Sequence, residues 1–135
     1  MLSKALHYEA KTFAHCWFEN ENGKFTKNHP LPIRAQFSSV NAIETIDYNG
    51  DEFRDLLLAG NLYQAEVETP RSDSGLGLVL VGSSQGFEVV APEHNGLLIR
   101  GDIKAVSPIQ LSGNRVGYLL GANNDQLRLV ELNKN

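Results

Sequence analysis

The stretch LLLAGN, residues 56–61, returns 62 positions later as YLLGAN, residues 118–123. The same shift places Phe25, which follows Asn-Gly, on Phe87, which follows Gln-Gly. It also places Trp17 and the residue after it on an apolar pair. A single offset that relates three separate segments indicates an internal structural repeat.

Short apolar runs fill the sequence between these landmarks, and Gly or Asn stands at nearly every connection. This spacing is typical of antiparallel strands joined by tight turns, while helical periodicity is scarce. We therefore predict an all-β fold of about nine strands. Pro108 lies inside one of them, and because proline cannot donate to a ladder we expect that strand to bend or end there.

Four strands per repeat are typical of a β-propeller blade. The chain is then a single domain, 1–135, of antiparallel β-propeller-like blades that form an incomplete ring. We expect open sheet edges in such a ring, and through them a homo-oligomer. About two blades and part of a third are predicted: a partial blade over 12–28, a full blade over 40–91 and a partial blade over 102–132.

Composition limits the possible partners. The 135 residues carry a net charge of −4 and no cluster of Lys and Arg, which argues against nucleic acid and anionic membranes. No apolar stretch approaches the roughly 20 residues of a membrane span, and the N-terminus lacks the apolar segment of a secretory signal. The chain itself gives no cellular address.

The stretch DYNGDEFRD, residues 47–55, places oxygen-bearing groups at alternate positions. Ca²⁺ takes six to eight oxygen ligands, and an extended loop can offer them from every second residue. The spacing predicts one calcium site. Its ligands are the side chains of Asp47, Asn49, Asp51 and Asp55 and the carbonyl of Phe53.

A plain hairpin turn is the alternative for this loop. Asn-Gly is a strong hairpin signal, and Asp at a turn entry caps backbone amides without a metal. Four acidic residues with only Arg54 nearby repel one another in a tight turn, which favours the calcium interpretation. Position twelve of the loop is Leu58 and strand-like sequence flanks it, so it is not an EF-hand.

The sequence VNAIETIDYNGDEFRDLLLAGN, residues 40–61, resembles an FG-GAP (VCBS-type) repeat: a strand, an acidic loop and a run such as LLLAGN. With the segments WFENENGKF, GLVLVG, SQGF and NND in order, residues 12–132 resemble the C-terminal portion of bacterial FG-GAP proteins related to the ASPIC/UnbV group. This resemblance implies propeller blades, Ca²⁺ in blade loops, export or surface attachment, and a role in adhesion or polysaccharide handling.

Two positions depart from the family pattern. Glu52 stands where the family usually has glycine, and the repeat-equivalent segment IQLSGNR, residues 109–115, carries no carboxylate. We therefore expect a single calcium site, which Glu52 either distorts or extends. Because the chain begins in the middle of a blade, it is expected to be a fragment of a longer protein or a truncated relative.

The polar segment 61–75 is the expected partner-binding loop, for a protein or a glycan, because insertions between strands often carry function. A solvated loop without a partner is its alternative. The residues concerned are Tyr63, Glu66, Glu68, Arg71 and Asp73.

The expected function is a non-enzymatic binding or scaffold module. A subunit of a carbohydrate-active hydrolase, with two carboxylates across a cleft, and a purely structural propeller fragment are the alternatives. GSSQG, residues 82–86, matches G-x-S-x-G, but a strand follows where that nucleophile motif needs a helix, so a hairpin turn is predicted there.

Overall fold

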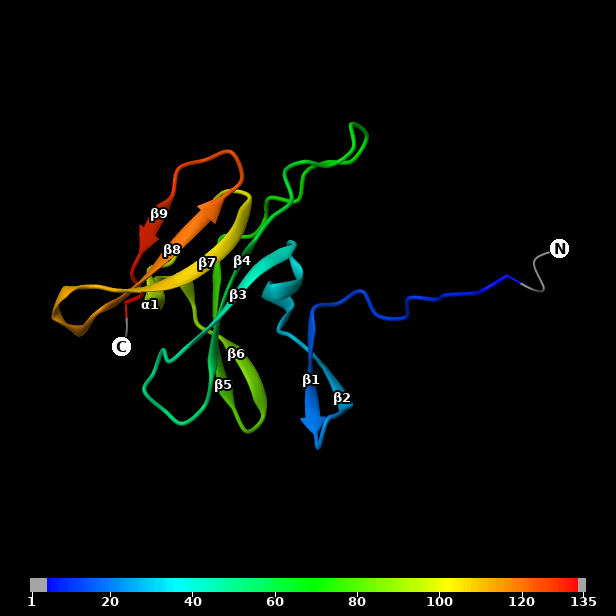
Figure 1. Cartoon of the computed structure of the whole chain (residues 1–135), viewed down its shortest axis with the longest axis horizontal. Coiled ribbons are helices and arrows are strands. Elements are labelled where there is room, and N and C mark those ends of the chain that lie inside the picture. Colours follow the sequence, from blue (N-terminus) through cyan, green and yellow to red (C-terminus); the bar gives the residue numbers. More distant parts are fainter. Residues whose placement is uncertain (1–4, 134–135) are drawn as a thin grey trace. The chain divides into compact units, whose positions relative to one another are not determined.

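The computed structural model describes residues 5–133 (Figure 1). Its nine strands over this range are all antiparallel to their neighbours, and its helices are single short turns, so the predicted all-β fold is confirmed. No helix within the described range is long and apolar enough to cross a membrane. The chain divides into two compact units, Met1–Leu31 and Pro32–Asn135.

The first unit is a hairpin of β1, Cys16–Glu21, and β2, Lys24–Pro30. The strands meet at Asn22 and Gly23, whose positive φ angles of 52° and 84° suit a two-residue hairpin turn. The Trp17 ring stacks on the His29 ring with centroids 4.3 Å apart.

The second unit begins with a four-stranded sheet in which each strand pairs with the next along the chain. Gly60 ends the second strand, and a Cβ there would lie 1.8 Å from the Ser39 carbonyl oxygen, so only glycine fits. The turn between the last two strands is the hairpin predicted for GSSQG. The strands are β3, Val40–Ile46; β4, Asp55–Gly60; β5, Leu78–Ser83; and β6, Gly86–Val89.

A three-stranded sheet follows. The prediction that its first strand bends or ends at Pro108 is wrong about the end, because the strand continues in register to Gln110. This strand is at the edge of its sheet, where proline is tolerated. The strands are β7, Ile103–Gln110; β8, Val116–Ala122; and β9, Arg128–Val130. The short helical turns are η1, Ile33–Gln36; α1, Pro92–Asn95; and η2, Ser112–Asn114.

The offset of 62 seen in the sequence also relates the strands. Shifting the bounds of β1 by 62 gives those of β5, and shifting β4 gives β8 to within one residue. The pairs β3–β4 and β7–β8 each carry a register irregularity at the same place, one residue into the first strand. Equivalent residues of β3 and β7 lie 63 apart, because seven residues connect Ile109 to its partner Gly117 where eight connect Ile46 to its partner Asp55.

The core of the second unit lies between its two sheets, with β3 beside β7 (Figure 1). One face of the four-stranded sheet packs against one face of the three-stranded sheet, and Leu97 and Ile99 of the connecting segment complete the contact. Both β4 and β5 also direct apolar side chains to the opposite face of their sheet, which makes it apolar on both sides. The core residues are Ile46, Tyr48, Leu57, Ala59, Val79, Leu97, Ile99, Ile103, Tyr118 and Leu120.

Candidate functional site

The acidic loop joins β3 to β4, and most of its polar side chains bond within the loop itself. Asp47 Oδ1 accepts from the Gly50 amide at 2.7 Å, and Asp51 Oδ1 accepts from the Phe53 amide at 2.7 Å. The Asn49 side-chain amide donates to Asp51 Oδ2 at 2.7 Å. The contact between Asp51 and the Phe53 amide is an Asx turn, in which a short polar side chain replaces a backbone partner.

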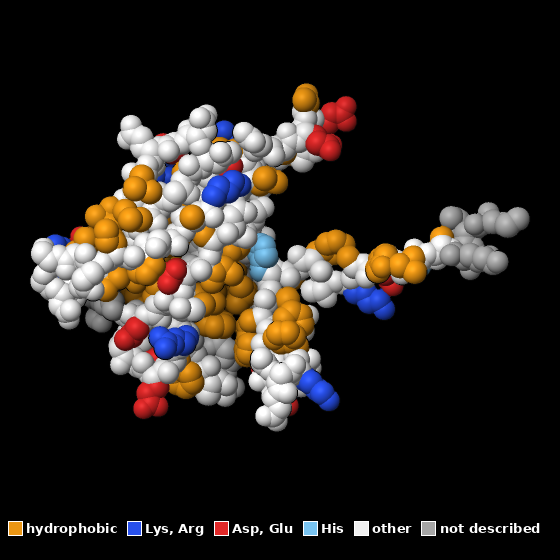
Figure 2. Space-filling view, viewed as in Figure 1, with side chains coloured by type: hydrophobic (Ala, Val, Ile, Leu, Met, Phe, Trp, Pro, Cys, Tyr) orange, Lys and Arg blue, Asp and Glu red, His pale blue; other side chains and the backbone are white. Residues whose placement is uncertain are grey.

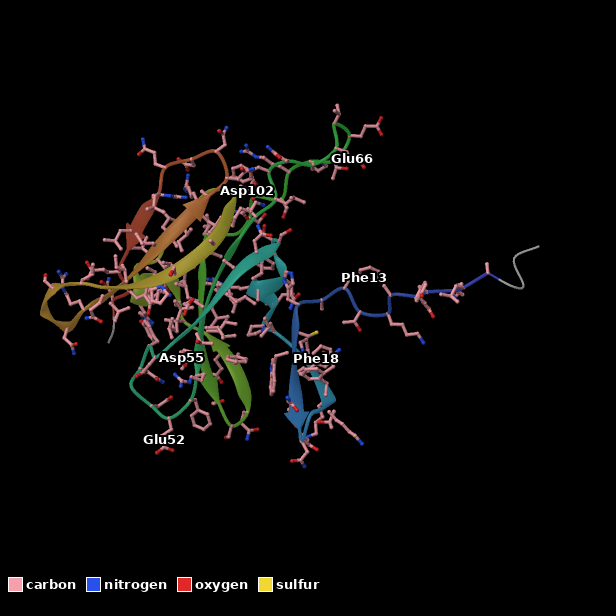
Figure 3. The ribbon with its side chains drawn as sticks, viewed as in Figure 1. Phe13, Phe18, Glu52, Asp55, Glu66 and Asp102 are labelled. Carbon is pink, nitrogen blue, oxygen red and sulfur yellow. The ribbon has the colours of Figure 1, made fainter. Side chains whose placement is uncertain are left out.

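Asp55 has a different environment, because its side chain is fully buried at the start of β4. One carboxylate oxygen accepts from the Tyr48 amide at 2.7 Å and the other from the Gly82 amide at 2.8 Å. The carboxylate therefore ties the start of the loop to the end of β5. Figure 3 shows Asp55 inside the fold and Glu52 at the outer end of the loop.

The structure thus separates the predicted calcium ligands into an exposed set, Asp47, Asn49 and Asp51, and a buried Asp55. Within residues 5–133, no three His, Cys, Asp or Glu side chains lie close enough together to hold a metal ion. The Phe53 side chain is partly exposed, and its amide belongs to the turn of Asp51. Calcium binding in this loop remains a prediction.

Segment 61–75 projects from the second unit as a narrow ribbon (Figure 1). A backbone bridge between Leu62 and Ser72 closes its base. Near the base, the Arg71 guanidinium lies 4.7 Å from the centre of the Tyr63 ring, and its Nε lies 2.8 Å from Asp73. The structure therefore brings together three of the five residues predicted to bind a partner.

The two remaining residues, Glu66 and Glu68, are exposed. Figure 3 shows Glu66 at the outer end of this ribbon. The Thr69 amide donates to the Glu66 carbonyl at 2.9 Å and closes the turn there. The ribbon therefore presents a negatively charged tip and a base where a cation lies on an aromatic ring.

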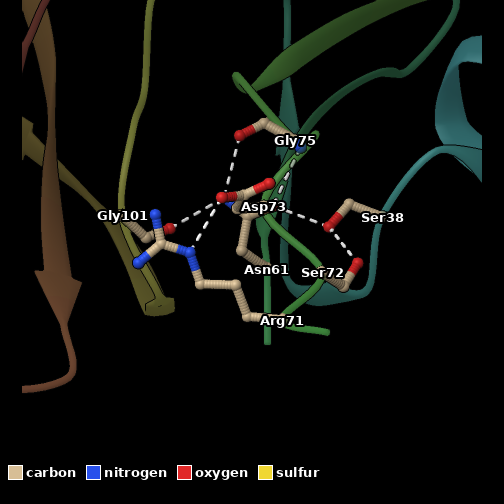
Figure 4. A network of polar contacts seen from close by, with 7 residues as sticks. All are labelled: Ser38, Asn61, Arg71, Ser72, Asp73, Gly75 and Gly101. Carbon is tan, nitrogen blue, oxygen red and sulfur yellow. Dashed lines mark hydrogen bonds and ion pairs between the residues drawn. The ribbon is translucent and has the colours of Figure 1, made fainter. Parts of the chain in front are cut away.

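Asn61 organises the base of the ribbon, and the sequence interpretation missed this role. Its buried side chain donates to the carbonyls of Gly75 at 2.8 Å and Gly101 at 2.9 Å (Figure 4). Its Oδ1 accepts from the Ser38 hydroxyl and from the Gly75 amide. The sequence feature that could have indicated this role is the asparagine that ends both LLLAGN and YLLGAN.

A polar pocket of about 250 Å³ lies beside this base, lined in part by Tyr63, Asp102 and Asp125. Asp102 is buried, and the Lys104 ammonium lies 2.7 Å from its Oδ1. That contact falls outside hydrogen-bond geometry and is ionic, and neither carboxylate oxygen has a hydrogen-bond partner. The Lys104 ammonium therefore offsets the charge of this buried carboxylate.

A second pocket, of about 320 Å³, opens on the face of the four-stranded sheet away from the core. The residues that line it are largely small or apolar, and they include Val40, Leu58 and Leu78. Arg34 of η1 is its charged residue. The sequence interpretation did not predict it, because it depends on how η1 and the segment before β5 lie over the sheet.

Tyr118 is the core residue whose titration the acidic loop affects. Burial raises the pKa of its phenol above the ordinary value, and the carboxylates of Glu44 and Asp47 raise the pKa further. Above an unfolded pKa of about 10, the unfolded chain therefore loses this proton before the folded chain does.

We expect the free energy of unfolding to fall as the pH rises through about 10, and Tyr118→Phe to reduce this loss. Urea unfolding on both sides of that pH measures it. The control is Tyr8→Phe, at an exposed tyrosine. An equal alkaline loss of stability in wild type and Tyr118→Phe would refute the assignment to Tyr118.

Comparison with models of known protein families gave no match, and neither the curated proteins nor the solved structures gave one.

Proposed function

We propose that this chain is a non-enzymatic binding or scaffold module of the FG-GAP type. In this proposal its sheets are propeller blades, and the 47–55 loop holds one Ca²⁺ for structural purposes. The ribbon at 61–75 carries the residues that bind a protein or glycan partner. The protein acts in a surface or exported system concerned with adhesion or glycan handling. The alternative within the same proposal is a purely structural fragment of a longer propeller that binds no ligand.

The observation that carries the proposal is the exposed loop of alternating oxygen ligands at the end of a well-paired hairpin. Strands β3 and β4 hold both ends of the loop in register, so its oxygens need little further ordering. A carboxylate oxygen has two lone pairs, so Asp55 can keep its two amide hydrogen bonds and still bind a cation.

Calcium binding requires the loop to rearrange, because its acidic side chains do not lie close enough together to hold a metal ion. The Asn49 side-chain amide now donates to Asp51, so Asn49 must turn its oxygen inward and release that carboxylate. The divalent charge offsets the repulsion among Asp47, Asp51 and Asp55. Loss of this exposed side-chain contact costs about 1 kcal/mol or less, which a bound Ca²⁺ exceeds.

The test is thermal and urea unfolding of metal-stripped protein with excess Ca²⁺ or with EDTA. Ligand that binds only the native state at 100 times its dissociation constant adds about 2.7 kcal/mol of stability. We expect a rise of this order in wild type, and its loss in Asp51→Asn. Calorimetric titration with Ca²⁺ measures the binding directly.

Glu52→Gln is the matched control, because it removes one neighbouring charge without removing a proposed ligand. Mg²⁺ at the same concentration separates calcium binding from general screening of the acidic loop. No stabilisation at millimolar Ca²⁺ would refute the calcium site and leave the loop as an acidic turn. Binding of a partner would then have to be tested at the ribbon alone.

The ribbon is tested separately, with immobilised glycans and bacterial surface polysaccharides as probes. Tyr63→Ala and Arg71→Ala remove the stacked pair at its base. The hydrolase alternative draws on Asp102 and Asp125, the two carboxylates of the polar pocket. Release of reducing sugar by wild type, abolished in Asp125→Asn, would replace the binding-module proposal with that alternative.

A further inference from the structure

The three-stranded sheet leaves one apolar face uncovered. Its register places Ala105 opposite Gly121 and Leu119 opposite Leu129, all on the side away from the core. Leu129 is 50% exposed and Ile109 is 37% exposed. We call the five residues Ala105, Ile109, Leu119, Gly121 and Leu129 the open face. Figure 2 shows hydrophobic side chains gathered over β7–β9.

The open face repeats a face that is buried elsewhere in the same chain. Leu57 and Ala59 of β4, at the offset of 62, correspond to Leu119 and Gly121, and both are buried in the core. The other correspondences follow from the offset of 63 and from the strand register. Ala42, Ile46 and Val79, all buried, correspond to Ala105, Ile109 and Leu129.

The surface that covers the buried copy also has a counterpart in the chain. The core side of the three-stranded sheet consists of residues such as Val106, Tyr118, Leu120 and Val130. The same offsets and register relate these residues to the side of the four-stranded sheet that faces away from the core. We call that side the acceptor face; its corresponding residues are Ile43, Leu56, Leu58 and Leu80.

Part of the acceptor face is accessible. Ile43 is 60% exposed, and the pocket of about 320 Å³ is open between Val40, Leu58 and Leu78. Leu58 and Leu80 are already buried, so a partner reaches this face at its β3 side. An exposed leucine or isoleucine of an open face is of a size to enter that pocket.

We propose that a second copy of this chain docks head to tail, with its acceptor face on the open face of the first. The contact pairs the same two kinds of face that pack on each other within the molecule, but it is confined to the β3 side of the acceptor face, because Leu58 and Leu80 are already buried. Because the two faces differ, the contact is heterologous and leaves one face of each kind free for further copies. This proposal does not depend on the calcium site.

The size of the open face predicts weak binding. Three strands about 4.8 Å apart, of which the central strand is seven residues long at about 3.3 Å each and β9 only three residues long, cover at most roughly 14 by 23 Å. That is about 300 Å² in projection, against the roughly 800 Å² that each partner buries in a standard interface. We therefore expect dissociation constants in the micromolar to millimolar range, with association that increases with concentration.

Two arginine substitutions test the proposal by sedimentation equilibrium. Leu129→Arg blocks the open face and Ile43→Arg blocks the acceptor face, so each variant alone is expected to associate at least about tenfold more weakly than wild type. An equimolar mixture still has one intact face of each kind, so it is expected to form a heterodimer of wild-type affinity and nothing larger.

Val67→Arg, at a fully exposed position of the ribbon, is the matched control and is expected to associate like wild type. Ser107→Arg and Thr45→Arg are a second pair of variants at exposed polar positions on the same two faces. They provide the same test if the first pair misfolds. A wild type that stays monomeric at every concentration overturns the proposal. So does a mixture no more associated than its separate components, which would indicate a symmetric contact or a different partner.

Discussion

Replacing Asn61 with aspartate is expected to lower the free energy of unfolding by about 3–5 kcal/mol, the range for an unpaired charge in a buried site. The Asn61 amide donates to the carbonyls of Gly75 and Gly101, and a carboxylate would face both oxygens without a proton to share. Two acceptors opposed to a negative charge lower the free energy of unfolding more than removal of the side chain would. Urea unfolding monitored by circular dichroism measures the change.

Two further substitutions at this position separate the contributions. Asn61→Ala removes the hydrogen bonds but not the strain of a φ of 98°, whereas Asn61→Gly removes the hydrogen bonds and relieves the strain. We expect alanine to destabilise by about 1 kcal/mol more than glycine. Aspartate that is tolerated as well as asparagine would show that the amide does not hold the base of the ribbon to the second sheet.

The second large effect is expected at Asp55. Asp55→Ala leaves the amides of Tyr48 and Gly82 without acceptors in a site with no solvent exposure. Each hydrogen bond to a charged group contributes about 1.5–3 kcal/mol, so the loss of both is expected to cost about 3–6 kcal/mol. Asp55→Asn is expected to lose less, because the amide oxygen still accepts one of the two protons.

Asp47→Asn is the control for this position, because Asp47 lies on the exposed side of the same loop. We expect it to change stability by less than about 1 kcal/mol in EDTA. Equal losses at the two positions would mean that the buried pairing of Asp55 contributes nothing beyond the charge of the loop. Denaturant unfolding in EDTA keeps this comparison independent of any bound cation.

Strand pairing was largely predictable from the sequence because it depends on local patterns. Alternation, glycine at strand ends and Asn-Gly turns identified the nine strands and their division into groups of two, four and three. The offset of 62 also predicted which strands are equivalent. The expectation that the strand could end at Pro108 was wrong because the effect of proline depends on whether its strand lies at an edge, and local sequence does not state this.

The candidate site was less predictable, because its residues meet across long stretches of chain. Asp55 was predicted as a loop ligand, but its position on the core side of β4 depends on the register with β3 and β5. Asn61 reaches Gly101, 40 residues away, and no spacing rule identifies such a contact. Tyr63, Arg71 and Asp73 come together because the bridge at Leu62 and Ser72 folds their segment on itself.

The neighbour-to-neighbour strand order has a consequence for how the chain folds. Every sheet pairs strands that are consecutive along the chain, so most loop closures within a sheet are short and their entropic cost is small, while residues 61–77 form the long connection between β4 and β5. The bonds from Asn41 to Ile103 and from Asn61 to Gly101 instead join the two sheets across 62 and 40 residues. During synthesis the four-stranded sheet can thus be complete before β7 leaves the ribosome, with its apolar core side exposed until β7 and β8 arrive.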